Sequence, residues 1–207
     1  ILNDALLIRA VLHGAVLAQV QAVDANFCEA DLRRADLSAS DCSGADFSGS
    51  RLDDALFTDA RLAAASVEGA TGRQADFTRA DISELRASEG CDLSAGRFYR
   101  ANGFESIWHG AVLADADFTC AGLQGADFTR AGLQRADFSA AEMRFARLMK
   151  ADLNAARLTY TNLFKGSLEK ADLTGADLTG ANLYAVEFLD AVVEHARLTE
   201  ANLKMTK

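Results

Sequence analysis

The sequence predicts an all-β solenoid, a rod built from stacked coils. Two observations predict this class: a five-residue word repeats along almost the whole chain, and proline is absent from all 207 residues. The clearest copies stand at residues 171–185, which read A-D-L-T-G, A-D-L-T-G and A-N-L-Y-A. Each word has a leucine at its centre, Asp or Asn immediately before it and a small residue two places before it. Because proline would remove a backbone donor, its absence suits an uninterrupted ladder of paired strands.

A period of five fits neither an α-helix nor a flat strand. On a helix, successive centres would lie roughly 140° apart and would form no common face. On a strand, an odd period would send successive centres to opposite sides of the sheet. The chain must therefore turn a corner in every word, with the small residue and the centre facing the interior, and the coils must stack along one axis.

The word A-(D/N)-L-x-x resembles that of the pentapeptide-repeat family, and the resemblance covers nearly the whole chain. It implies a right-handed quadrilateral β-helix with four words to the coil. The centres number 18 from Leu2 to Ala87 and 23 from Leu93 to Leu203, which makes about ten coils. We therefore expect one domain over residues 1–207, roughly 50 Å long at ~4.8 Å per coil. The absence of an initial methionine is compatible with a fragment of a larger protein.

The register of the word shifts once, near residues 85–90. Centres fall at numbers ending in 2 or 7 up to Ile82 and in 3 or 8 from Leu93 onward. We interpret Gly90 as an inserted residue at a corner, because glycine tolerates the backbone that such a bulge needs. In the irregular coil that follows, residues 97–112, Trp108 should stack over Ala87, a small neighbour that leaves room for the ring.

The outer side of this irregular coil is a candidate partner-binding surface. Outward positions there hold apolar or aromatic residues where the word prefers polar ones: Phe104, Ile107, His109 and Val112. The alternative is a local loop that packs on its own coil.

The first coil carries a second apolar group, again at outward positions. Its members are Ile1, Leu6, Val11 and Val16. Solenoid ends need a cap over their open strand edges, so a preceding segment could cover this ring; the alternative is a homodimer or partner interface at this end.

The charge distribution limits the nucleic-acid hypotheses. A formal net charge of −9 argues against binding that works by neutralising phosphates. The acidity is concentrated in the first half, with 15 acids against 8 arginines up to Glu89. One coil there carries an acidic ring, Asp31, Asp36, Asp41 and Asp46. The ring is either a solvated outer surface or part of a protein that imitates nucleic acid.

We find no catalytic or metal-binding pattern in the sequence. The three histidines, His13, His109 and His195, lie far apart, and no nucleophile, phosphate-loop or metal-ligand spacing is present. An interior filled by two side chains per word leaves no substrate pocket. The sequence therefore predicts a protein that is not an enzyme and needs no cofactor.

Two functions from different classes remain open. The first is a protein-interaction or structural module, one domain of a larger bacterial protein such as a secretion-associated protein or effector. The second follows from the resemblance, since some family members protect or inhibit DNA gyrase by mimicking DNA. No apolar run reaches the length of a membrane span. We expect a cytoplasmic location, with secretion through a specialised system left open.

Overall fold

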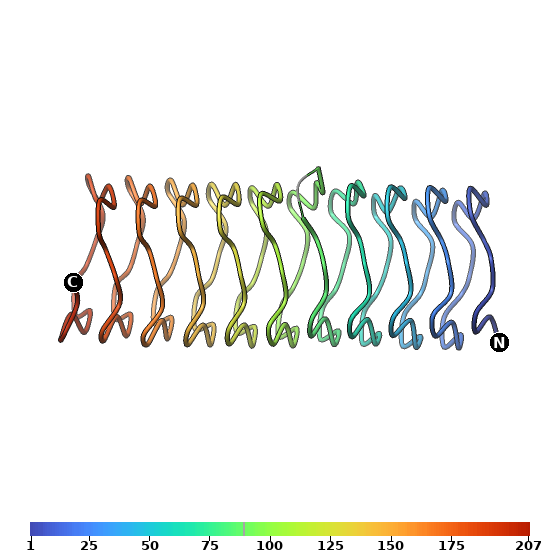
Figure 1. The fold of residues 1–207 in the computed structure, drawn as a ribbon, viewed down its shortest axis with the longest axis horizontal. Helices are drawn as coiled ribbons and strands as arrows, with labels where there is room; N and C mark the ends of the chain where they lie inside the picture. The colour runs from blue at the N-terminus through green and yellow to red at the C-terminus, as the bar shows by residue number, and fades with distance from the viewer. Residues whose placement is uncertain (89) are drawn as a thin grey trace.

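The chain folds into a straight rod of stacked coils, with the two termini at opposite ends (Figure 1). The structure is a computed structural model, and it describes residues 1–88 and 90–207. Within these residues the backbone forms no helix, and its β-structure consists of isolated parallel bridges. The predicted class, an all-β helix of about ten coils, is confirmed.

The bridges hold each coil to the next. The residue before each centre pairs with the residue at the same position one coil later, 20 residues on, as Asp31 does with Arg51. Each such pair makes two backbone bonds: the Leu32 N–H donates to the Arg51 carbonyl at 2.8 Å, and the Arg51 N–H donates to the Ala30 carbonyl at 2.9 Å. Four words therefore make one coil, and the four outer walls carry four columns of bridge residues.

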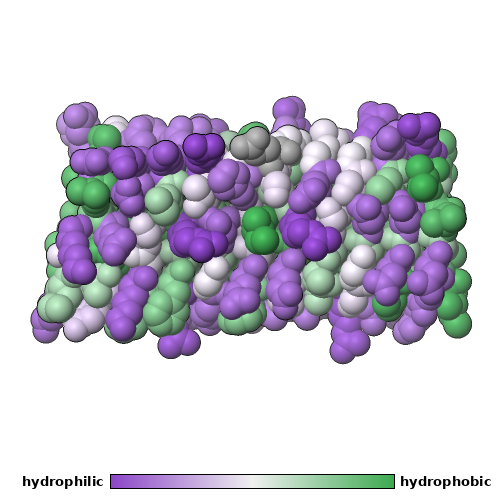
Figure 2. All heavy atoms as spheres, viewed as in Figure 1, coloured by the Kyte–Doolittle hydropathy of each residue, from purple (hydrophilic) through white to green (hydrophobic). Residues whose placement is uncertain are grey.

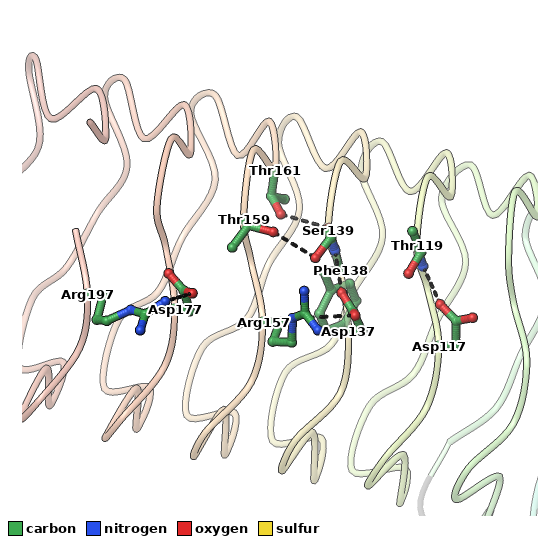
Figure 3. A network of polar contacts seen from close by, with 10 residues as sticks. All are labelled: Asp117, Thr119, Asp137, Phe138, Ser139, Arg157, Thr159, Thr161, Asp177 and Arg197. Atoms are coloured by element: carbon green, nitrogen blue, oxygen red, sulfur yellow. Dashed lines mark hydrogen bonds and ion pairs between the residues drawn. The ribbon is translucent and has the colours of Figure 1, made fainter. Parts of the chain in front are cut away.

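One of these columns carries acidic and basic residues. It contains Asp117, Asp137, Arg157, Asp177 and Arg197, which pair in that order. Figure 3 shows this wall and the corner beside it.

The aspartate before each centre stabilises the corner that follows. In the wall of Figure 3, the Asp117 carboxylate accepts the Thr119 N–H at 2.9 Å, and Asp137 does the same for Ser139 at 2.9 Å. At each described corner the second outward residue has a positive φ, 52–62° even where it is not glycine. Left-handed backbone costs energy for a residue with a Cβ. Capping of the neighbouring N–H by the carboxylate helps to offset that cost, which explains why the word prefers Asp or Asn.

The interior is filled by the two inward residues of each word. Phenylalanines stack along one column, with ring centroids 4.5 Å apart between Phe98 and Phe118 and 4.9 Å between Phe118 and Phe138. Trp108 is fully buried on the opposite wall and stacks on Phe128 of the next coil at 5.8 Å. Its indole N–H donates to the buried Ser106 hydroxyl at 2.7 Å. Trp108 is thus a core residue, as predicted.

The bridge spacing changes from 20 to 21 residues beside the insertion. Ser66 pairs with Arg86, but Thr71 pairs with Asp92. Gly90 has a φ of +86°, and the Cys91 N–H donates to the Ser88 carbonyl at 3.1 Å, so the corner contains one residue more than the others. Arg86 pairs with Ile107, which places Ala87 and Trp108 at matching positions in adjacent coils, as the sequence predicted.

Candidate functional site: an aromatic corner of the rod

The predicted partner surface divides into two parts. Phe104, Ile107 and Val112 are 46%, 39% and 44% exposed, so their side chains reach the outside. Ile107 is in the wall column between Arg86 and Asp127, whereas Val112 is in the next column. Because four columns complete one coil, these two side chains face directions about a quarter-turn apart. His109 lies at the corner between the two walls and is partly buried. A single flat partner could not contact Ile107 and Val112 together.

Phe104 belongs to a longer feature that runs along one corner. The backbone bonds between coils place a pair of outward residues from each coil at this corner. We call it the aromatic corner and define it as residues 83–84, 104–105, 124–125, 144–145, 164–165, 184–185 and 204–205. Four of its side chains are aromatic: Phe104, Phe145, Phe164 and Tyr184.

The aromatic rings of the corner support one another. Phe145 packs edge-on to Phe164 at 6.0 Å, and Phe164 stacks on Tyr184 at 5.5 Å. The Lys165 ammonium lies 5.3 Å from the centre of the Phe164 ring, a cation–π distance. Phe145 remains 54% exposed. Aromatic side chains with this exposure are typical of protein-binding surfaces.

Sequence reasoning missed Phe145, Phe164 and Tyr184. Each stands one or two places after a centre, where the word tolerates any residue, so none breaks the repeat. The signal that could have found them is their spacing of about 20 residues, which stacks them on one corner.

A hollow separates Phe104 from Phe145 along this corner. It has a volume of about 610 Å³ and is lined by Ser83, Glu84, Asn102, Phe104, Gln124, Arg144 and Phe145. The coil between Phe104 and Phe145 contributes Gln124 to the lining and carries two glycines beside it, Gly122 and Gly125. A second hollow of about 380 Å³ lies beyond Phe145, beside Lys165 and Met205.

Arg144 of the aromatic corner pairs with Glu142 at 4.0 Å, but three other charged residues of the corner have no ion-pair partner among the described residues. On other walls, acids pair with arginines of the next coil, as Asp127 does with Arg147 at 2.8 Å. In the described part of the chain, no ion pair involves Glu84, Glu105 or Lys165. The acids lie in the N-terminal half of the corner and the lysine in the C-terminal half, so the corner is electrostatically polarised.

The apolar ring of the first coil is the most exposed on the rod. Ile1, Leu6, Val11 and Val16 are 96%, 78%, 82% and 81% exposed, and Figure 2 shows hydrophobic residues gathered at this end. Their positions face away from the axis. Val112 stays 44% exposed although coils flank it on both sides, so a coil stacked on this end would cover only about half of each side chain. Their role as a cap contact or an end interface stays a prediction.

The acidic ring lies on four different walls, and hydrogen bonds occupy each of its carboxylates. Asp31 accepts the Arg33 guanidinium at 2.7 Å and Asp36 accepts the Ser38 N–H at 2.9 Å. Asp41 accepts the Ser43 hydroxyl at 2.7 Å and lies 3.6 Å from the Arg61 guanidinium, and Asp46 accepts the Ser48 N–H at 2.9 Å. The hydrogen bond from the Arg33 guanidinium is the main cause that lowers the pKa of Asp31 to about 2. The acids therefore stabilise corners and are partly neutralised by arginine.

The charged side chains of the described residues are spread over the outer surface of the rod. Among the described residues, no three His, Cys, Asp or Glu side chains cluster as a metal site would require. The described residues also include no helix long and apolar enough to span a membrane. The outer surface presents side chains at fixed spacing on a rigid rod, and the aromatic corner is one of its apolar features.

Stacked coils, a filled interior and a five-residue word define this protein as a solenoid of the right-handed β-helix class. A family model described as pentapeptide repeats matches residues 2–34, 23–54, 55–94, 105–134, 131–168 and 167–204. The chain belongs to the pentapeptide-repeat family. No curated protein sequence matches it.

Two solved structures illustrate the likeness. HetL, a pentapeptide-repeat protein involved in heterocyst differentiation regulation in Nostoc sp. strain PCC 7120, is 27% identical, with a TM-score of 0.74 over 96% of this chain and 88% of HetL. QnrB1, a plasmid-mediated fluoroquinolone resistance protein, is 23% identical, with a TM-score of 0.47 over 76% of this chain and 88% of that one. The HetL match supports the same architecture along almost the whole rod.

Proposed function

We propose that this chain is a non-enzymatic protein-interaction module whose contact surface is the aromatic corner. The observation that carries the proposal is the pair of exposed rings, Phe104 and Phe145, which border a hollow and are continued by the half-buried Phe164 and Tyr184. Burying such rings in a partner removes apolar area from water and fills the hollow. The involvement of HetL in regulation is compatible with a function exerted through contacts.

The proposal is tested by photo-crosslinking in the source cells. A benzoylphenylalanine introduced at Phe145 should form an adduct that mass spectrometry can identify. The matched control is Tyr160, which occupies the same position of its word on a different corner and is 66% exposed. Adducts at Phe145 and none at Tyr160 support the proposal, whereas equal yields at both positions, or none at either, contradict it.

Substitutions in the predicted partner surface distinguish a role in partner binding from a role in the stability of the rod. Replacing Phe104 and Ile107 with serine should change the free energy of unfolding by less than about 1 kcal/mol, because both side chains are substantially exposed. The same change should weaken the complex found by crosslinking. A large loss of stability in urea unfolding would show that these side chains are structural.

The second candidate function is mimicry of DNA toward gyrase or another type II topoisomerase. The net charge of −9 favours it. The ion pairs of the acidic ring count against it: Asp31 pairs with Arg33 and Arg51, and Asp41 pairs with Arg61. These arginines reduce the negative electrostatic potential of the ring. A supercoiling assay with DNA gyrase distinguishes the two functions: inhibition or protection that needs the acidic ring would favour mimicry. Membership of a larger bacterial protein and a cytoplasmic location stay predictions.

A further inference from the structure

The second position of the aromatic corner carries a self-complementary pattern. Four consecutive coils present Glu105, Gly125, Phe145 and Lys165 at this position, as the backbone bonds between coils show. In order they are an acid, a gap, a projecting ring and a base. If the same four residues of a second copy are placed alongside in reverse order, each residue faces a complementary one: the lysine faces the glutamate, and the phenylalanine ring faces the glycine.

We propose that two copies of this chain associate side by side and antiparallel through the aromatic corner. The two-fold axis lies in the interface, perpendicular to both rods, and is level with the boundary between the coil of Gly125 and the coil of Phe145. Phe145 of each copy then lies against Gly125 of the other, where no side chain projects, and Glu105 of each copy meets Lys165 of the other. The proposal rests on the proposed function, because it assigns a partner to the same surface.

The first position of the corner agrees with the same axis. In chain order it holds Ser83, Phe104, Gln124, Arg144, Phe164 and Tyr184. An antiparallel two-fold axis preserves the side of the corner, so this row meets itself in reverse. Phe104 then faces Phe164, Gln124 faces Arg144, and the Ser83 hydroxyl faces the Tyr184 phenol. Each pair can stack or hydrogen-bond.

Charge complementarity selects a second copy as the occupant. Glu105 and Lys165 lie three coils apart in one chain, roughly 14 Å at the spacing of paired strands, which is beyond a direct ion pair. In the described part of the chain neither has an ion-pair partner. The antiparallel arrangement forms two ion pairs between Glu105 of one copy and Lys165 of the other, one on each side of the two-fold axis.

The glycine in the pattern has a steric role. At Gly125 a Cβ would approach the Glu105 side chain to 3.2 Å, so a larger residue would crowd the space beside Glu105 that the partner's ring occupies. Lysine is compatible with this backbone, since Lys150, Lys165 and Lys170 adopt φ values of 54–58° at the same position of the word. A Gly125→Lys variant should therefore fold and yet exclude the partner's ring.

The test is a charge exchange followed by sedimentation equilibrium and light scattering across the micromolar range. Lys165→Glu and Glu105→Lys should each weaken the dimer by about tenfold, because each dimer loses two attractions and gains two repulsions. The double variant should restore the wild-type dissociation constant. Lys150→Glu, at the same position of a word on another corner, is the matched control and should leave association unchanged.

Two further measurements locate the contact. Gly125→Lys should abolish the dimer, whereas Gly175→Lys, at a corner glycine with open space around it, should not. Raising the salt concentration should weaken the wild-type dimer. A chain that is monomeric at every concentration overturns the proposal, as does a dimer indifferent to Lys165→Glu, or a double variant as weak as the single ones.

Failure of this proposal is distinguishable from failure of the proposed function. If the chain is monomeric but benzoylphenylalanine at Phe145 captures a different protein, the second copy is excluded and the interaction function stands. If the Phe145 adduct has the mass of two chains, both proposals are supported. A monomer that forms no adduct at Phe145 overturns both.

Discussion

Replacing Ser106 with alanine should destabilise the rod even though it moves the sequence toward its own repeat. Ser106 occupies the small inward slot, where most words carry alanine, and it is fully buried. Its hydroxyl accepts the Trp108 indole N–H at 2.7 Å and donates to the Gly103 carbonyl at 2.8 Å. Alanine would remove the acceptor and leave the indole N–H in an apolar interior without a partner.

The expected magnitude follows from this geometry. A buried donor left unsatisfied costs about 1–3 kcal/mol, because its bonds to water in the unfolded chain are not replaced. The volume change is one oxygen atom, so the cavity contribution is small beside that cost. We therefore expect the free energy of unfolding to fall by about 1–3 kcal/mol, which for a chain of this size lowers the melting temperature by roughly 2–12 °C.

The assay is guanidinium unfolding, followed by the fluorescence of Trp108, the single tryptophan, and by circular dichroism. Ser50 is the matched control, because it occupies the same slot and is fully buried, but within the described structure its hydroxyl has no hydrogen-bond partner. Ser50→Ala should stabilise the rod by about 1 kcal/mol. Equal effects of the two substitutions, or a stabilising Ser106→Ala, would refute the reasoning.

Three further predictions concern the core, the thiols and the carboxylates. Leu173→Asp should unfold the rod, since it places a charge in a filled interior; retained β circular dichroism would contradict the inward position. At pH 8 only Cys120 should react with iodoacetamide in the native state, because it is exposed whereas burial raises the pKa of Cys28 and of Cys42 to about 11 and that of Cys91 to about 12; native adducts at these three thiols in a mass spectrum would be evidence against the packing. Acid should unfold the rod progressively from about pH 4 toward pH 2, because the bond from Arg33 lowers the pKa of Asp31 and the bond from Thr179 lowers that of Asp177. Their contribution is complete above the unfolded carboxyl pKa and is lost as the pH falls through the folded value; an unfolding free energy that does not change between pH 5 and pH 2 would contradict it.

The architecture could be predicted from the sequence because one constraint is repeated about forty times. A period of five that cannot form a helix or a strand leaves few alternatives, and the inward positions of Leu173 and Trp108 followed from register alone. These predictions needed no knowledge of side-chain conformation.

The candidate site was less predictable, because it depends on positions that the word does not constrain. The sequence drew attention to Phe104, Ile107 and Val112 as local irregularities. The structure instead places Phe104 on one corner with Phe145 and Tyr184, which lie 41 and 80 residues away along the chain. The bond between Ser106 and Trp108 was equally out of reach, since it requires the orientation of the indole ring. The hydrogen bonds that occupy the acidic ring also depend on rotamers.

The most direct test of the account compares the aromatic corner with the acidic ring by affinity isolation of the tagged chain from its source cells. One variant replaces Phe104, Phe145 and Phe164 with serine. The other replaces Asp31, Asp36, Asp41 and Asp46 with asparagine, which keeps the oxygen that caps each corner, as Asn26 does for the Cys28 N–H. The account predicts that the corner variant loses the partners that the wild type retains and that the ring variant keeps them. Loss of partners from the ring variant alone would contradict the account and would favour mimicry of DNA.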